Sequence, residues 1–70
     1  MADALIFSLN GETRAYPPPL SVAELLVRIG LDKRKVAVEL NEEIVPRSAY
    51  GVTWVREGDK LEIVHFIGGG

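Results

Sequence analysis

The chain has 70 residues, of which 47% are apolar, no cysteine and a formal net charge of −2. This length and composition predict one small domain built around a single core. The lack of cysteine excludes disulfides, a cysteine nucleophile and thiolate metal ligands, and a lone histidine cannot build a metal site, so we expect no bound metal. The charge gives no broad basic field for nucleic acid, and no apolar stretch reaches the roughly 20 residues that span a bilayer.

The N-terminal part of the chain predicts a β-hairpin. Three alternating apolar residues share one face of the first predicted strand: Leu5, Phe7 and Leu9. Asn10-Gly11 follows, a pair that tolerates the positive φ of a tight turn. The segment "ETRAY" at 12–16 can then return antiparallel to the first strand.

One helix is predicted after the prolines at 17–19, which end the hairpin because proline donates no ladder hydrogen bond. Ser21 can cap the first turn, and Glu24 lies three residues on, as in a capping box. Gly30 suits the left-handed residue that ends a helix. Four apolar residues share one face of this helix: Val22, Leu25, Leu26 and Ile29.

The second half of the chain predicts strands on either side of an irregular connection. "KVAVEL" at 35–40 alternates as a strand does, and a turn at "NEE" leads to Ile44 and Val45. We expect a long connection over 46–55, because Pro46 opposes a central strand and Gly51 opposes a helix. The strand "LEIVHFI" is strongly apolar, which favours a central place in the sheet.

Together these elements predict an α+β fold. The sheet is mixed, with four or five strands, and the one main helix packs on one face, because each element has a single apolar face to bury. We assign residues 1–67 to this domain and residues 68–70 to a flexible C-terminal glycine tail.

The tail is suited to chemistry at the end of the chain. Glycine has no Cβ, so Gly68 and Gly69 can thread a narrow channel and carry the α-carboxylate of Gly70 into another protein's active site. That carboxylate is unreactive toward nucleophiles until it is activated, for example by adenylation. The chain has neither a P-loop pattern nor a nucleophile-and-base set, so we expect a substrate of enzymes and not an enzyme.

Several segments, in their order and spacing, resemble the ThiS family of thiamine-biosynthesis sulfur carrier proteins. They are the strand that ends at Asn10-Gly11, "SVAELL", "VAVELN" followed by "EIVPR", "EGD", and "LEIVHFIGGG". The resemblance covers essentially the whole chain. It implies the ubiquitin-like β-grasp fold, which agrees with the predicted order of elements.

The resemblance also implies a reaction and its partners. An adenylyltransferase similar to ubiquitin-activating enzymes would use ATP and Mg²⁺ to adenylate Gly70. Sulfur from a cysteine-derived persulfide would then displace AMP, and the resulting thiocarboxylate would give its sulfur to thiazole synthase. We expect no cofactor on the carrier, which would be monomeric when free. The N-terminus "MADALIF" lacks the basic segment of an export signal, so we expect a cytoplasmic protein.

The predicted docking residues lie before the tail and on the sheet face away from the helix. Val64 is expected on that face, and Phe66 and Ile67 lead off the domain as exposed apolar groups. Ile6 is expected to join Val64 on the same face. Arg47 is either a contact for a partner or a solvated residue of the long connection.

Three other functions fit a glycine tail on this fold. The small subunit of molybdopterin synthase is a sulfur carrier that also ends in two glycines, but that family is usually longer and has prolines before them. A ubiquitin-like modifier would use the tail to form isopeptide bonds. In a toxin-like or purely structural interaction domain the glycines would be inert.

Overall fold

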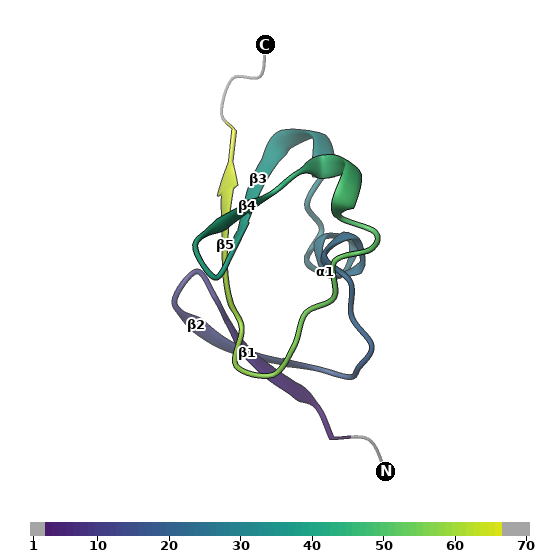
Figure 1. Cartoon of the computed structure of the whole chain (residues 1–70), viewed down its shortest axis with the longest axis vertical. Helices are drawn as coiled ribbons and strands as arrows, with labels where there is room; N and C mark the ends of the chain where they lie inside the picture. Colours follow the sequence, from purple (N-terminus) through teal and green to yellow (C-terminus); the bar gives the residue numbers. More distant parts are fainter. Residues whose placement is uncertain (1–2, 67–70) are drawn as a thin grey trace.

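In the described part of the chain, five strands form one mixed sheet, and one α-helix covers one of its faces (Figure 1). The computed structural model describes residues 3–66. The elements in chain order are β1 (Leu5–Leu9), β2 (Glu12–Tyr16), α1 (Val22–Ile29), η1 (Lys33–Lys35), β3 (Val36–Leu40), β4 (Glu43–Val45), η2 (Arg47–Ala49) and β5 (Lys60–His65). The strand order is β2-β1-β5-β3-β4, which confirms the predicted α+β fold and the central place of the last strand.

The predicted hairpin is β1 paired antiparallel with β2. The register places Leu9 opposite Glu12, so only two residues form the turn. Asn10 and Gly11 both have positive φ, 52° and 82°. These are the conformations that a two-residue hairpin turn requires, and this explains why asparagine and glycine stand there.

Helix α1 has both of the predicted end signals. The Ser21 hydroxyl accepts a hydrogen bond of 3.0 Å from the Glu24 N–H, and Gly30 ends the helix with a φ of 81°. The inner face buries Val22, Leu25 and Leu26. Nowhere in residues 3–66 is a helix long and apolar enough to cross a membrane.

The segment between β4 and β5 is the long connection that the sequence predicts. It passes the start of α1, where the Val22 N–H donates to the Thr53 carbonyl at 2.9 Å and the Val55 N–H donates to the Leu20 carbonyl at 2.8 Å. Trp54 forms only an isolated bridge with Ser21. These contacts close the side of the core that the sheet and the helix leave open.

The core lies between the sheet and α1, and β5 runs through its middle. Leu61 is fully buried and Ile63 is 8% exposed, whereas their neighbours Glu62 and Val64 point to the other face of the sheet. The buried apolar residues are Phe7, Leu9, Leu20, Val22, Leu25, Leu26, Val36, Val38, Val45, Tyr50, Val55, Leu61 and Ile63. This confirms the alternation predicted for the strands.

Two asparagine side chains in hairpin turns bind the backbone of β5. Asn10 Nδ2 donates to the Ile63 carbonyl at 3.1 Å, and Asn10 Oδ1 accepts from the Ile63 N–H at 2.7 Å. On the other edge of β5, Asn41 Oδ1 accepts from the Lys60 N–H at 2.9 Å. Each amide side chain therefore continues the ladder beyond the end of the neighbouring strand.

Replacing Asn10 with glycine should lower the free energy of unfolding by about 1 to 3 kcal/mol. Glycine keeps the positive φ at this position, so the loss isolates the two side-chain hydrogen bonds to Ile63. Urea unfolding of Asn10→Gly measures the change.

The matched control is Glu42→Gly, another positive-φ residue in a hairpin turn, with a φ of 70°. Its side chain makes only a surface ion pair of 3.9 Å with Lys60, so this variant should be as stable as the original protein or slightly more stable. Equal losses in the two variants would contradict a special role for the Asn10 side chain.

Candidate partner-docking site

The described part of the chain ends one residue after β5, at Phe66. The Phe66 N–H donates to the Lys35 carbonyl at 2.8 Å, so hydrogen bonding to the neighbouring strand region continues to the last described residue. Val64 is 59% exposed and Phe66 is 49% exposed. The expected site residues Ile67, Gly68, Gly69 and Gly70 lie outside the described residues.

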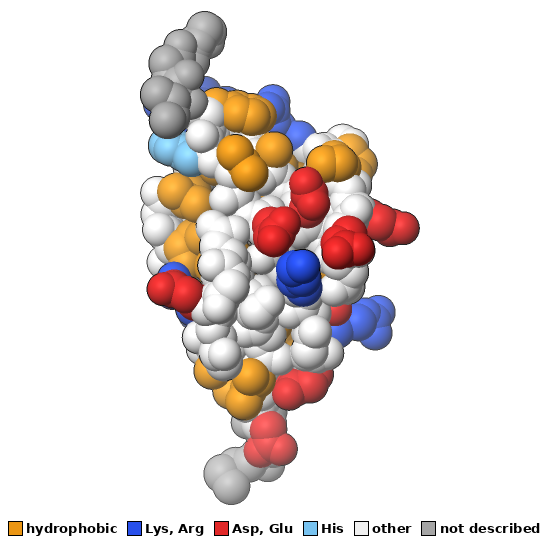
Figure 2. All heavy atoms as spheres, turned by 90° about the vertical axis from the view of Figure 1, so that its left-hand side faces the viewer, with side chains coloured by type: hydrophobic (Ala, Val, Ile, Leu, Met, Phe, Trp, Pro, Cys, Tyr) orange, Lys and Arg blue, Asp and Glu red, His pale blue; other side chains and the backbone are white. Residues whose placement is uncertain are grey.

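Four apolar residues form what we call the exit patch, on the outer face of the sheet: Ala37, Ile44, Val64 and Phe66. Ala37 is the direct cross-strand partner of Val64. Ile44, 67% exposed, pairs with Glu39 and therefore lies diagonally across from Ala37. Figure 2 shows this face of the sheet, with apolar side chains gathered at its upper end.

Ile44 is not among the predicted docking residues, although the sequence carries a signal for it. In a strand, adjacent side chains point to opposite faces, so only one of Ile44 and Val45 could enter the core. Val45 is buried at 8% exposure, which leaves Ile44 on the outer face. What the sequence alone could not show is that β4 and β5 both pair with β3, from opposite sides, which places Ile44 and Val64 on the same face of the sheet.

Ile6 lies on the expected face but not in the exit patch. It is 48% exposed, and its carbonyl accepts from the Gly58 N–H at 2.8 Å, which places it beside the start of β5. From Lys60, where β5 begins, to Val64 the strand advances about 13 Å at ~3.3 Å per residue, and Gly58 lies two residues before that start. A partner that contacts both Ile6 and Val64 must therefore span most of the sheet.

Carboxylates lie beside the exit patch on the same face. Glu39 of β3 and Glu62 of β5 are direct cross-strand partners, and in residues 3–66 neither forms an ion pair. The nearby Lys60 ammonium lies 3.9 Å from Glu42 instead. Figure 2 shows the acidic side chains below the apolar ones, around one basic side chain. Two like charges placed directly opposite each other destabilise a sheet.

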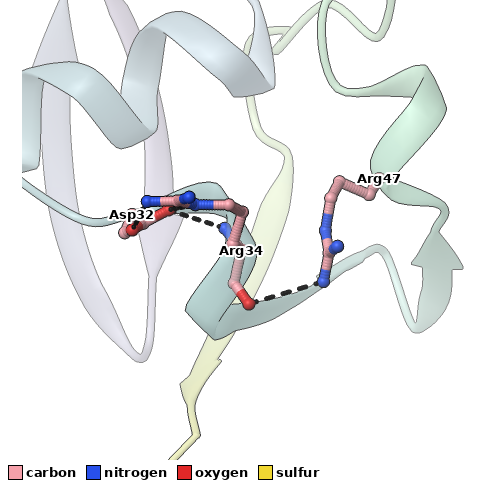
Figure 3. Close-up of polar contacts among 3 residues, drawn as sticks. All are labelled: Asp32, Arg34 and Arg47. Atoms are coloured by element: carbon pink, nitrogen blue, oxygen red, sulfur yellow. Dashed lines mark hydrogen bonds and ion pairs between the residues drawn. The ribbon is translucent and has the colours of Figure 1, made fainter. Parts of the chain in front are cut away.

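Basic residues lie near the C-terminal end of β5, in η1 and η2. Hydrogen bonds from the Arg34 side chain and backbone N–H, 2.9 Å each, hold the pKa of Asp32 well below its usual value (Figure 3). Arg47 points toward the same turn, but its Nη2 lies 3.5 Å from the Arg34 carbonyl, a long and weak contact. Among the described residues Arg47 has no carboxylate partner, which leaves its charge available to another protein.

The residues around the C-terminal end of β5 are those of a binding surface and not of a catalytic site. His65 is exposed, and within residues 3–66 no three acidic or histidine side chains come together as a metal site would require. The described part of the chain has one mainly apolar core, and none of its buried side-chain polar atoms lacks a hydrogen-bond partner. This arrangement can present a chain end to an enzyme, and its exposed apolar and charged groups can select that enzyme.

The comparisons with known proteins agree on one family. Residues 7–70 match the model of the ThiS family. The chain is 38% identical over 66 residues to the sulfur carrier protein ThiS of Bacillus subtilis, covering 93% of this chain and all of that protein. The crystal structure of the thiamine biosynthesis protein ThiS from Geobacter metallireducens superposes with a TM-score of 0.81 at 35% identity, covering 94% of this chain and all of that one.

A longer relative carries a similar segment. The chain is 56% identical over 62 residues to a thiazole synthase of Paramagnetospirillum magneticum. The match covers 89% of this chain but only 19% of that protein, so the chain spans about a fifth of its length.

Removing one carboxylate of the Glu39 and Glu62 pair should stabilise the protein. Glu62→Gln keeps the shape of the side chain and ends the like-charge repulsion, so we expect a gain of about 0.2 to 1 kcal/mol in the free energy of unfolding at low salt. The gain should shrink as salt screens the charges. The control is Glu12→Gln, which removes a carboxylate 3.3 Å from Arg14 and should give no gain. A loss of stability in Glu62→Gln would show that Glu62 has a favourable partner.

Proposed function

Because the chain belongs to the ThiS family and is thus a non-catalytic sulfur carrier of thiamine biosynthesis, we propose that Gly70 holds the sulfur as a thiocarboxylate. The observation that carries this proposal is the position of β5. This central strand ends beside an exposed apolar patch, and in the sequence three glycines follow two residues after it, at 68–70. Residues 1–67 then serve as the domain that enzymes recognise, and residues 68–70 as the tail that enters their active sites.

The proposed chemistry has three steps. A carboxylate oxygen of Gly70 attacks the α-phosphorus of ATP, and pyrophosphate leaves to give an acyl adenylate. The terminal sulfur of a cysteine persulfide attacks the acyl carbon, and AMP leaves. A second thiol then cleaves the sulfur–sulfur bond, which frees the thiocarboxylate and leaves a disulfide between that thiol and the cysteine. In this proposal the carrier itself holds no cofactor, since ATP and Mg²⁺ belong to the adenylating enzyme.

Two enzymes are the proposed partners: an adenylyltransferase similar to ubiquitin-activating enzymes, and thiazole synthase. The second has support in the relative from Paramagnetospirillum magneticum, because a protein named thiazole synthase contains a stretch that is 56% identical to this chain over 62 residues. Joining two modules in one polypeptide raises their effective concentration, which favours modules that act together. The proposed adenylating enzyme needs ATP, which supports a cytoplasmic location for the carrier.

We place the docking of both enzymes on the exit patch and Arg47. Val64 and Phe66 are exposed apolar groups next to the tail, where a contact can align it with an active site. Arg47 adds a positive charge from η2, and Ile6 extends the same sheet face for a partner of sufficient size. Ile67 joins the patch to the glycines in the sequence.

Thiocarboxylate formation can be read directly from the mass of the protein. After incubation with the adenylating enzyme, ATP and a persulfide source, the intact mass should rise by the difference between one sulfur and one oxygen atom. Deleting Gly70 should abolish the rise. An unchanged mass, under conditions in which the carrier from Bacillus subtilis is converted, would contradict the proposed role of Gly70. A mass increase equal to a whole second protein would instead support a modifier.

A charge placed in the exit patch should weaken docking. Val64→Glu introduces a carboxylate at a 59% exposed position, and we expect the KM of the adenylating enzyme for this carrier to rise at least about tenfold. The control is Val27→Glu on the outer face of α1, a position that is 77% exposed and lies across the domain from the sheet's outer face. Equal KM values for the two variants would show that docking does not use the exit patch.

A further inference from the structure

The two edges of β5 are covered over different lengths. Strand β3 pairs with β5 from Leu61 to His65. Strand β1 pairs with it only at Lys60 and Leu61, because the chain turns away at Asn10. In Figure 1 the upper part of β5 accordingly extends beyond the hairpin of β1 and β2.

The hydrogen bonds show which way each backbone group of β5 points. The Phe66 N–H donates to Lys35, so Phe66 points its backbone groups toward the β3 side. In an antiparallel pair these groups alternate, so His65, which is opposite Val36, points its N–H and C=O away from β3. The same alternation holds lower down, where the Leu61 carbonyl accepts from the Asn10 N–H on the β1 side at 2.9 Å.

Between Leu61 and His65, the Asn10 side chain occupies this edge of β5. It satisfies both the N–H and the C=O of Ile63, the last residue on this edge with a partner from within the described chain. His65 follows, exposed, with both backbone groups turned to an unoccupied edge. The open position borders Val64 and Phe66 of the exit patch.

We propose that this open edge at His65 pairs with an extended main-chain segment of the enzyme that docks on the exit patch. The segment would accept a hydrogen bond from the His65 N–H and donate one to the His65 carbonyl, as an added strand does. The inference rests on the proposed function, because it assumes that an enzyme docks there. It adds the element that would hold the chain straight as it leaves the domain.

A partner segment fits this edge better than a second copy of the chain. The edge offers two backbone hydrogen bonds, and two such bonds contribute too little to hold a dimer that lacks other contacts. They suffice to direct a segment whose protein is already bound to the adjacent exit patch. The residues at this edge also lack the lysine, proline or bulge with which proteins protect open strand edges from pairing.

Two substitutions at one position test the proposal. His65→Pro removes the N–H and places a ring on the open edge, while the hydrogen bond from the Phe66 N–H to the Lys35 carbonyl stays. His65→Ala removes the side chain and keeps the N–H. We expect both variants to unfold at similar temperatures. His65→Pro should bind the adenylating enzyme at least about tenfold more weakly than His65→Ala.

Amide hydrogen exchange in the original protein provides a second test that needs no variant. In the free carrier the His65 amide should exchange quickly, whereas the Ile63 amide, bonded to Asn10 Oδ1, should be protected. In the complex with the adenylating enzyme, exchange at His65 should slow at least about tenfold. This measurement decides the question even if the proline variant does not fold.

The outcomes separate this inference from the proposed function. If the carrier binds and is converted but His65 stays fast in exchange, or if the proline and alanine variants bind equally, the edge is not used and the inference is wrong. If the original carrier is not converted at all, the proposed function fails and the inference with it. Concentration-dependent protection of His65 without enzyme would assign the edge to a second copy and overturn the assignment to a partner.

Discussion

The structure depends on holding β5 in the middle of the sheet. This strand is the last in the described part of the chain, yet it lies between the first and the third strands, and neither neighbour is long enough to pair with all of it. Asn10 and Asn41 compensate by binding its backbone with their side chains from opposite edges. Leu61 and Ile63 complete the anchoring, since they are buried against α1 and the other strands. Under the proposed function this arrangement matters because the partner enzymes would need to find the tail at a defined position.

Anchoring and function make opposite demands on alternate residues of β5. The inward residues are apolar and buried, which stabilises the domain. The outward residues include Val64, which exposes apolar surface, and Glu62, which faces Glu39 at a cost in stability. Proteins commonly accept such costs where a surface serves a partner. The outer face of the sheet is therefore the surface on which the proposed docking of a partner is best tested.

Much of the fold was predictable because its signals are local. Alternation identified the strands, Ser21 and Gly30 marked the ends of the helix, and Asn10-Gly11 marked the hairpin turn; the structure confirms each. The candidate site was predictable only in part. Val64 and Phe66 followed from the alternation of one strand, but Ile44 and the Glu39 and Glu62 pair involve different strands, whose neighbours and register a single sequence does not specify.

By itself, the sequence determined the elements, the apolar face of each, and the family, because these depend on short-range patterns and on the order of motifs along the chain. Only the tertiary structure decided that Ile6 and Val64 lie far apart on one face and that the Asn10 side chain belongs to the ladder of β5. It also decided that His65 turns its backbone to an open edge. The physical reason is that strand register joins residues distant in sequence, and register is set by the packing of the whole sheet against its helix.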